Sequence, residues 1–254
     1  MQQIVFDSTW NGLLTAIFEV YEYKFNAVRI ARAGNSASLF SEAHTVITQA
    51  EKAERVKVQL EKLVGKRTLQ DLYKTFLSET DEAANLIFNY VQYVISAGGD
   101  AAKNFSNPFV LGVQQTAKKV HREKHRMEAF IRFQCSSDNL YYAWIEPDFD
   151  VLPIIAIHFK NRYADQQWLI YDTKRKYGLH YDLHTVQEVT INFDVDINNK
   201  SSIAKIYGET EELYQTLWKQ YFKSVNIKAR KNTKLHIQHM PKRYWKYLVE
   251  KQEC

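Results

Sequence analysis

The chain has 254 residues, of which 45% are hydrophobic, and its 34 Lys and Arg against 29 Asp and Glu give a net charge of +5. A chain of this length can bury a core, as one or two domains, without disulfide or metal support. Its two cysteines are too few for a four-cysteine zinc site or the three-cysteine set of a radical-type iron–sulfur cluster. With no secretory pattern in Met1–Asp7 and no long apolar stretch, we expect a soluble cytoplasmic protein.

The positive charge is concentrated near the C-terminus. From Leu213 to Val249 the sequence has seven lysines, two arginines and no acid, so this stretch carries +9 and the remainder carries −4. Such a separation of charge along the chain indicates what the protein binds and does not indicate its fold.

The first hundred residues are predicted to be mainly helical, because apolar residues recur at helical spacing in successive segments. The predicted elements are a strand at Gln3–Phe6, a helix over Trp10–Tyr21, a strand at His44–Thr48, and helices over Ala53–Leu63, Thr68–Ser78 and Leu86–Ile95. The turn-rich segment Ala97–Pro108 is the best candidate boundary between two sub-domains, 1–100 and 105–254, of a single unit spanning 1–254.

The remaining residues predict a sheet followed by helices. Expected here are a helix over Phe109–Arg126, strands at Ala129–Cys135, Leu140–Glu146, Gln167–Asp172 and Val189–Ile197, a crossover helix at Val151–Tyr163, a helix from Thr210, and a final helix beginning near Pro241. The predicted fold class is therefore α+β, with an N-terminal helical part, a central mainly antiparallel sheet, and basic C-terminal helices packed on it.

The basic C-terminal stretch is the first candidate binding site. Cationic side chains neutralise phosphates and release counterions, which drives nucleic-acid binding. The residues expected to contact phosphate are Arg230, Lys231, Lys234, Lys242, Arg243 and Lys246. The neighbouring aromatic residues Tyr244 and Trp245 could stack on bases, but the favoured interpretation is that they anchor this helix to the core together with Leu248.

A second basic run, Lys118–Arg126, offers Arg122 and Arg126 as further phosphate contacts. His121 and His125 share a helical face, as two zinc ligands can. Glu123 is the third residue of the segment His121–His125, whereas the zinc-protease pattern HExxH has its glutamate in second place, and the surrounding cations oppose a bound dication. We therefore expect no metal here.

A third pattern consists of carboxylates at strand ends. Glu146 ends one predicted strand and Asp148 follows it, while Asp172 ends the next strand and Lys174 follows that one. This Pro-Asp…Asp-x-Lys spacing satisfies the loose pattern of restriction-type nucleases, in which paired carboxylates hold magnesium and a lysine assists the attacking water. The pattern is short, and aspartates after strands are also ordinary turn formers.

Several short segments together resemble a bacterial family of DNA-metabolism or DNA-repair proteins built on a domain of unknown function. They are Phe76–Glu79, the stretch from His125-Arg126 to Phe130–Phe133, Ile145–Asp148, Val151–Pro153, His158-Phe159, Trp168–Asp172, Leu217–Phe222, Arg230–Asn232 and Met240–Lys246. The resemblance spans essentially the whole chain. It implies a partner, because members are typically encoded beside a radical-SAM DNA modification or repair protein. It implies no catalytic residues, and glycosylase activity, which the longer members suggest, is not carried over to this short form.

The leading hypothesis is a DNA repair or DNA metabolism accessory protein that binds nucleic acid, a radical-SAM partner, or both, and needs no cofactor of its own. One alternative is a metal-dependent nuclease that uses Glu146, Asp148, Asp172 and Lys174. The other is a protein-binding subunit without DNA affinity, whose basic tail contacts an acidic partner. The sequence leaves open whether this chain catalyses any reaction.

Overall fold

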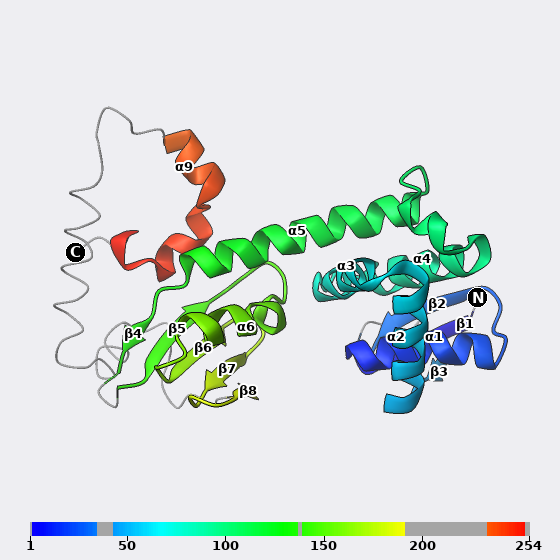
Figure 1. The fold of residues 1–254 in the computed structure, drawn as a ribbon, viewed down its shortest axis with the longest axis horizontal. Coiled ribbons are helices and arrows are strands. Elements are labelled where there is room, and N and C mark those ends of the chain that lie inside the picture. The colour runs from blue at the N-terminus through cyan, green and yellow to red at the C-terminus, as the bar shows by residue number, and fades with distance from the viewer. Residues whose placement is uncertain (1, 35–42, 137–138, 191–232, 252–254) are drawn as a thin grey trace. The chain divides into compact units, whose positions relative to one another are not determined.

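The computed structural model describes residues 2–34, 43–136, 139–190 and 233–251 (Figure 1). It consists of two compact units, Met1–His121 (unit 1) and Arg122–Cys254 (unit 2), which divide within the long helix α5, Pro108–Phe130. The turn-rich segment Ala97–Pro108 proposed as a boundary thus lies inside unit 1. Within the described residues, no helix combines the length and the hydropathy needed to cross a membrane.

Unit 1 contains a small parallel sheet with strand order β2-β1-β3. Its strands are β1 (Gln2–Phe6), β2 (Val28–Arg32) and β3 (Ala43–Thr45). The structure confirms the strand at Gln3–Phe6 and places the predicted second strand slightly earlier in the chain. Strand β2 was not predicted. It pairs with β1 in parallel, and Ile30 is almost fully buried.

Helices make up the rest of unit 1 (Figure 1). They are α1 (Trp10–Glu22), α2 (Ala50–Val64), α3 (Lys66–Leu77), α4 (Ala83–Ala97), the short 3-10 helix η1 (Gly99–Lys103) and the part of α5 up to His121. The Thr9 hydroxyl caps α1 by accepting a hydrogen bond from the Gly12 amide at 2.9 Å. Gly65 separates α2 from α3 at φ = 82°, a backbone conformation that glycine adopts readily. Leu13, Leu72 and Ile87 are completely buried in the core.

Unit 2 contains a five-stranded sheet with strand order β4-β5-β6-β7-β8. Its strands are β4 (Gln134–Cys135), β5 (Tyr141–Ile145), β6 (Trp168–Asp172), β7 (Tyr177–Tyr181) and β8 (Val186–Val189). Strands β5 and β6 are parallel, and the other neighbours are antiparallel. Helix α6 (Leu152–Arg162) connects the parallel pair, which confirms the predicted crossover helix and both of its flanking strands.

The prediction of a strand over Ala129–Cys135 was wrong for most of that segment. Helix α5 continues to Phe130, and only Gln134–Cys135 pairs as a strand. The amide of Ile131 still donates to the carbonyl of Met127 at 3.1 Å, which is a helical hydrogen bond. The Met127 residue is buried. Tertiary burial therefore outweighs the local aromatic and β-branched composition. Of the predicted strand Val189–Ile197, residues 191–197 lie outside the described residues, as does the helix predicted from Thr210.

The C-terminal elements of unit 2 are α9 (Thr233–His239) and the 3-10 helices η4 (Lys242–Tyr247) and η5 (Val249–Lys251). Tyr244 is 2% exposed and Leu248 is fully buried, which confirms that residues of this segment anchor it to the core. The Tyr247 hydroxyl lies 3.2 Å from that of Thr173, so η4 is held against the end of β6. The mixture of helices and sheets confirms the α+β fold class.

Candidate functional site

A polar pocket of about 420 Å³ lies in unit 2, where the parallel strands β5 and β6 end. The carboxyl ends of neighbouring parallel strands meet at one edge of a sheet, which is a common place for a binding site. Here the segment after β5 and the turn after β6 meet residues of η4. The residues that line this carboxyl-edge pocket are Glu146, Pro147, Asp148, Lys174, Lys242, Arg243 and Lys246.

The two strand-end segments are joined by Arg175. Its guanidinium donates to the Asp172 carboxylate at 2.8 Å and to the carbonyls of Pro147 and Asp148 at 3.2 Å each. The other Asp172 carboxylate oxygen accepts from the backbone amides of Lys174 and Arg175 at 2.8 and 3.1 Å. Asp172 is fully buried and is absent from the pocket lining. Its carboxylate shapes the turn between β6 and β7.

Helix η4 supplies three cations, two of which pair with the carboxylates that follow β5. Arg243 donates to the Asp148 carboxylate at 2.5 Å, and Lys246 contacts the Glu146 carboxylate. Glu146 also accepts from the Tyr247 hydroxyl at 2.8 Å. The hydrogen bond from Lys246, followed by that from Tyr247, lowers the pKa of Glu146, and the bond to Glu146 raises the pKa of Lys246. Both partners are therefore charged near neutral pH.

The buried carboxylate of Glu123, on α5, binds both the segment after β5 and helix η4 behind the pocket lining. Its side chain is 1% exposed and accepts from the Tyr244 hydroxyl, from the Asp148 amide at 2.9 Å and from Arg126 at 3.3 Å. Arg243 approaches the same carboxylate at 3.5 Å. Burial, and then the hydrogen bond to Glu123, raise the pKa of Tyr244. Glu123 thus links α5, the segment after β5, and η4.

The structure brings together part of the predicted phosphate-binding set. Lys242, Arg243 and Lys246 line the pocket with Lys174, which had been proposed only as a nuclease residue. Arg126 contacts Glu123 and does not line the pocket. Two other predicted cations, Arg122 on α5 and Lys234 on α9, are exposed and do not line the pocket. The last two, Arg230 and Lys231, lie outside the described residues.

The structure also places the predicted nuclease residues. Glu146, Asp148 and Lys174 share the pocket, whereas the Asp172 carboxylate is occupied by Arg175 and two backbone amides. In the part of the chain that the structure describes, no three His, Cys, Asp or Glu side chains are grouped so that they could hold a metal ion. His125 lies on the surface, 82% exposed, 3.9 Å from Glu128.

Sequence reasoning assigned no role at this site to Glu123, Arg175 or Tyr247. One signal for Glu123 was available, because it is the single acid in the otherwise basic run Lys118–Arg126. A lone carboxylate among cations that is three residues from an arginine can form a helical ion pair, and Glu123 does so with Arg126. Nothing local distinguishes Tyr247, whose partner Glu146 is 101 residues away.

Comparison with known proteins identifies a family domain that includes the carboxyl-edge pocket. A search of curated proteins found no match. A family model described as "Domain of unknown function (DUF4130)" matches residues 81–250, about two thirds of the chain. The matched range contains the lining of the carboxyl-edge pocket together with Glu123, and it leaves out the first 80 residues, so it is shorter than the resemblance that the sequence suggested. The chain belongs to the DUF4130 family, which is defined by this domain of unknown function.

Proposed function

We propose that this protein binds nucleic acid at the carboxyl-edge pocket, as an accessory protein in DNA repair or DNA metabolism. The observation that carries the proposal is the convergence of four cations, Lys174, Lys242, Arg243 and Lys246, on one pocket. Three of them come from the basic C-terminal stretch that the charge distribution singled out. Phosphate oxygens are the common ligand of such clusters in nucleic-acid-binding proteins.

The charge of the pocket supports a phosphate ligand. Its lining has four cations and two carboxylates, which leaves a net charge of +2. The carboxylates hold Arg243 and Lys246 in place in the absence of ligand, and their side chains are 42–49% exposed. Exposed ion pairs contribute about 0–1 kcal/mol, so a phosphate can replace a carboxylate as the partner of each cation at small cost.

We further propose that the protein acts with a radical-SAM DNA modification or repair protein. The two cysteines of this chain cannot supply the three thiolates of a radical-SAM cluster. The bacterial family that the sequence resembles implies such a partner. In this division of labour the partner performs the chemistry, and this chain holds the nucleic acid near it.

The proposal is tested by fluorescence anisotropy with labelled single- and double-stranded DNA at about 0.15 M salt. The variant Lys242→Gln/Lys246→Gln removes two charges from the pocket, and Lys62→Gln/Lys66→Gln removes two exposed charges from unit 1. Losing two phosphate contacts weakens binding by about tenfold or more at this salt concentration. We expect this loss in the pocket variant only. Equal affinities of all three proteins would overturn the assignment of the pocket.

Two further arms separate the alternatives. Co-precipitation of the radical-SAM protein without measurable DNA affinity would favour the protein-binding subunit. DNA nicking that depends on magnesium or manganese, and that disappears in Asp172→Ala, would favour the nuclease. The burial of the Asp172 carboxylate against Arg175 favours the binding role over the nuclease role.

A further inference from the structure

Two of the four cations of the carboxyl-edge pocket form no ion pair with a carboxylate of the described residues. Lys174 Nζ lies 3.4 Å from the backbone carbonyl oxygen of Asp148, and Lys242 Nζ lies 5.9 Å from the centroid of the Trp245 ring. Both lysines are exposed. Because the other two cations are matched by carboxylates, these two lysines account for the net charge of +2 of the lining.

The volume of the pocket suits one small group. It is about 420 Å³, near the lower end of the range of about 300–1,000 Å³ in which proteins bind small ligands. All four cations converge on this one hollow at the ends of β5 and β6, and they do not follow a strip along the surface. A binding site for a length of nucleic-acid backbone would spread its cations along the strand, since the phosphates themselves are spread.

The charge of the pocket suits a phosphomonoester better than a phosphodiester. A phosphomonoester carries a charge of about −1.5 to −2 at neutral pH and has three strong acceptor oxygens. An internal phosphodiester carries a single negative charge, and the next phosphate of the strand is separated from it by a sugar. A single monoester therefore brings into one pocket the two negative charges that match Lys174 and Lys242.

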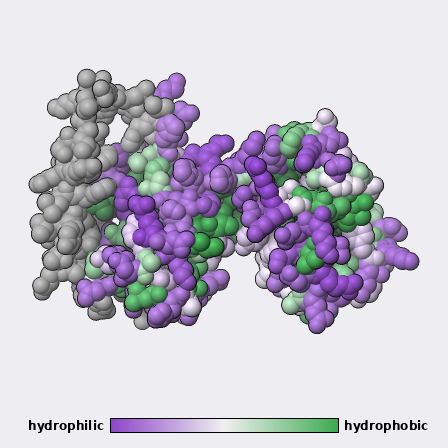
Figure 2. Space-filling view, viewed as in Figure 1, coloured by the Kyte–Doolittle hydropathy of each residue, from purple (hydrophilic) through white to green (hydrophobic). Residues whose placement is uncertain are grey.

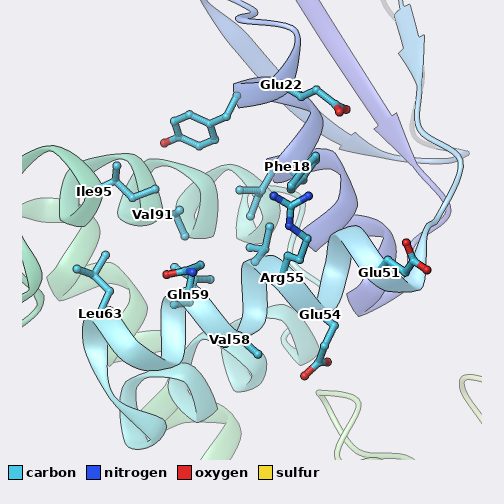
Figure 3. Close-up of a pocket in the computed structure, with 14 residues that line it drawn as sticks. Phe18, Glu22, Glu51, Glu54, Arg55, Val58, Gln59, Leu63, Val91 and Ile95 are labelled. Carbon is cyan, nitrogen blue, oxygen red and sulfur yellow. The ribbon is translucent and has the colours of Figure 1, made fainter.

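The large groove of unit 1 has a different character. It lies between α1, α2 and α4, has a volume of about 950 Å³, and is lined mainly by apolar side chains such as Val91 and Ile95 (Figure 3). On the face of unit 1 that Figure 2 presents, green apolar surface is visible between purple hydrophilic areas. The one cation of the described groove lining, Arg55, has its guanidinium carbon 4.9 Å from the centroid of the Phe18 ring. A dianion would meet one cation there instead of four, so this groove provides a control position.

We propose that the carboxyl-edge pocket binds the terminal phosphate of a DNA strand, a phosphomonoester at its 5′ or 3′ end. Lys174 and Lys242 bind the phosphate oxygens, and Arg243 and Lys246 add their charges from beside their carboxylate partners. This inference rests on the proposed function and deepens it, because it names the strand end as the part of the DNA that the site recognises.

The test compares three single-stranded DNA oligonucleotides of one sequence and about 12 nucleotides, which carry a 5′-phosphate, a 3′-phosphate or no terminal phosphate. A fluorophore on an internal base leaves both ends free, and anisotropy measures the affinity of the full chain at about 0.15 M salt. We expect one phosphorylated form to bind at least about tenfold more tightly than the unphosphorylated form, which corresponds to one charge-assisted hydrogen bond. The preferred form identifies the end that the pocket binds.

The variant Lys174→Gln/Lys242→Gln tests the two lysines. Its affinities for the phosphorylated and unphosphorylated oligonucleotides should agree within about twofold, because the two charges that match the monoester are gone. The matched control Arg55→Gln/Lys62→Gln removes two exposed charges from unit 1 and should keep the preference of the wild type. All four positions are exposed, and circular dichroism checks that each variant folds. A preference that persists undiminished in Lys174→Gln/Lys242→Gln would overturn the inference.

The pH dependence of the preference tests recognition of the dianion. The second pKa of a phosphomonoester is about 6, so only about a quarter of it is dianionic at pH 5.5. The described lining of the pocket contains no histidine, and the unphosphorylated oligonucleotide serves as the reference at each pH. The ratio of the two affinities should fall about fourfold between pH 7.5 and pH 5.5. An unchanged ratio would contradict recognition of a dianion.

The outcomes separate this inference from the proposed function. Equal affinities of the wild type for all three oligonucleotides would overturn the inference and leave the proposed DNA binding in place. No measurable affinity for any of them would overturn both. A free nucleoside monophosphate that competes as well as the unlabelled phosphorylated oligonucleotide would assign the pocket to a small nucleotide instead of a strand end.

Discussion

Replacing Glu123 with alanine removes the acceptor that three segments of unit 2 share. The carboxylate is 1% exposed and accepts from the buried Tyr244 hydroxyl, from the Asp148 amide at 2.9 Å and from Arg126 at 3.3 Å. After the substitution, the hydroxyl and the amide lose a charged acceptor, and water has little access to replace it. Arg126, with 22% of its side chain exposed, can recover part of its hydration.

The size of the effect follows from burial. Breaking a buried charged pair by removing one partner costs about 3–5 kcal/mol, whereas surface substitutions change stability by about 0.5 kcal/mol or less. We expect Glu123→Ala to lower the free energy of unfolding of unit 2 by about 3–5 kcal/mol. Glu123→Gln retains an oxygen acceptor but loses the charge, and should cost about 1–3 kcal/mol. Glu61→Ala, at an exposed position of α2, is the matched control.

Native-state hydrogen exchange measured by mass spectrometry is the appropriate assay, because two units need not unfold in a single transition. Peptides covering β5, β6 and η4 should lose protection in Glu123→Ala, and peptides covering α1 should not. A loss below about 1 kcal/mol in the unit 2 peptides would refute the reasoning, since it would mean that the buried carboxylate does not hold these segments together.

Three further predictions concern single side chains. Because its pKa is lowered by Lys246, Glu146 stabilises the folded state above its ordinary pKa of 4.5, and this contribution is lost as the pH falls through the lowered value. Urea unfolding at several acidic pH values should therefore show a weaker pH dependence in Glu146→Gln, and identical profiles would contradict the ion pair. The same variant should bind DNA about threefold more tightly, because one unit charge acting at about 7 Å in water is worth about 0.6 kcal/mol; weaker binding in anisotropy would oppose this account. Tyr90, whose buried hydroxyl has no hydrogen-bond partner among the described residues and whose pKa burial raises to about 12, should tolerate phenylalanine with a gain of about 1 kcal/mol in urea unfolding, and a loss would show that the hydroxyl is satisfied.

The crossover unit β5–α6–β6 could be predicted from sequence because its signals are local. Two short aromatic and β-branched runs flank an apolar segment with proline near its start, and each part formed close to the expected bounds. The end of α5 could not be predicted in this way. The strand-like run Ala129–Cys135 begins within its last turn, but Met127 is buried there and the Phe130 ring lies against that of Tyr244, a residue distant in sequence.

At the candidate site, too, local sequence patterns predicted some features, and tertiary contacts decided the others. Spacing alone indicated that Glu146, Asp148 and Lys174 follow two neighbouring strands, and the parallel pairing of β5 with β6 brings them to one edge. Spacing did not indicate that the carboxylates pair with cations about 100 residues later, as Glu146 does with Lys246. Nor did it indicate that the Asp172 side chain turns inward to Arg175. Side-chain direction depends on tertiary contacts that no local pattern encodes.

The salt dependence of DNA binding tests the central claim most directly. Each phosphate contact contributes about 0.9 to the slope of log K against log salt concentration on duplex DNA, and about 0.7 on single strands. The account predicts that Lys242→Gln/Lys246→Gln reduces the magnitude of the duplex slope by about 1.8, while Lys62→Gln/Lys66→Gln leaves it unchanged. A pocket variant with the wild-type slope would contradict the account, because the lysines of the carboxyl-edge pocket would then make no phosphate contacts.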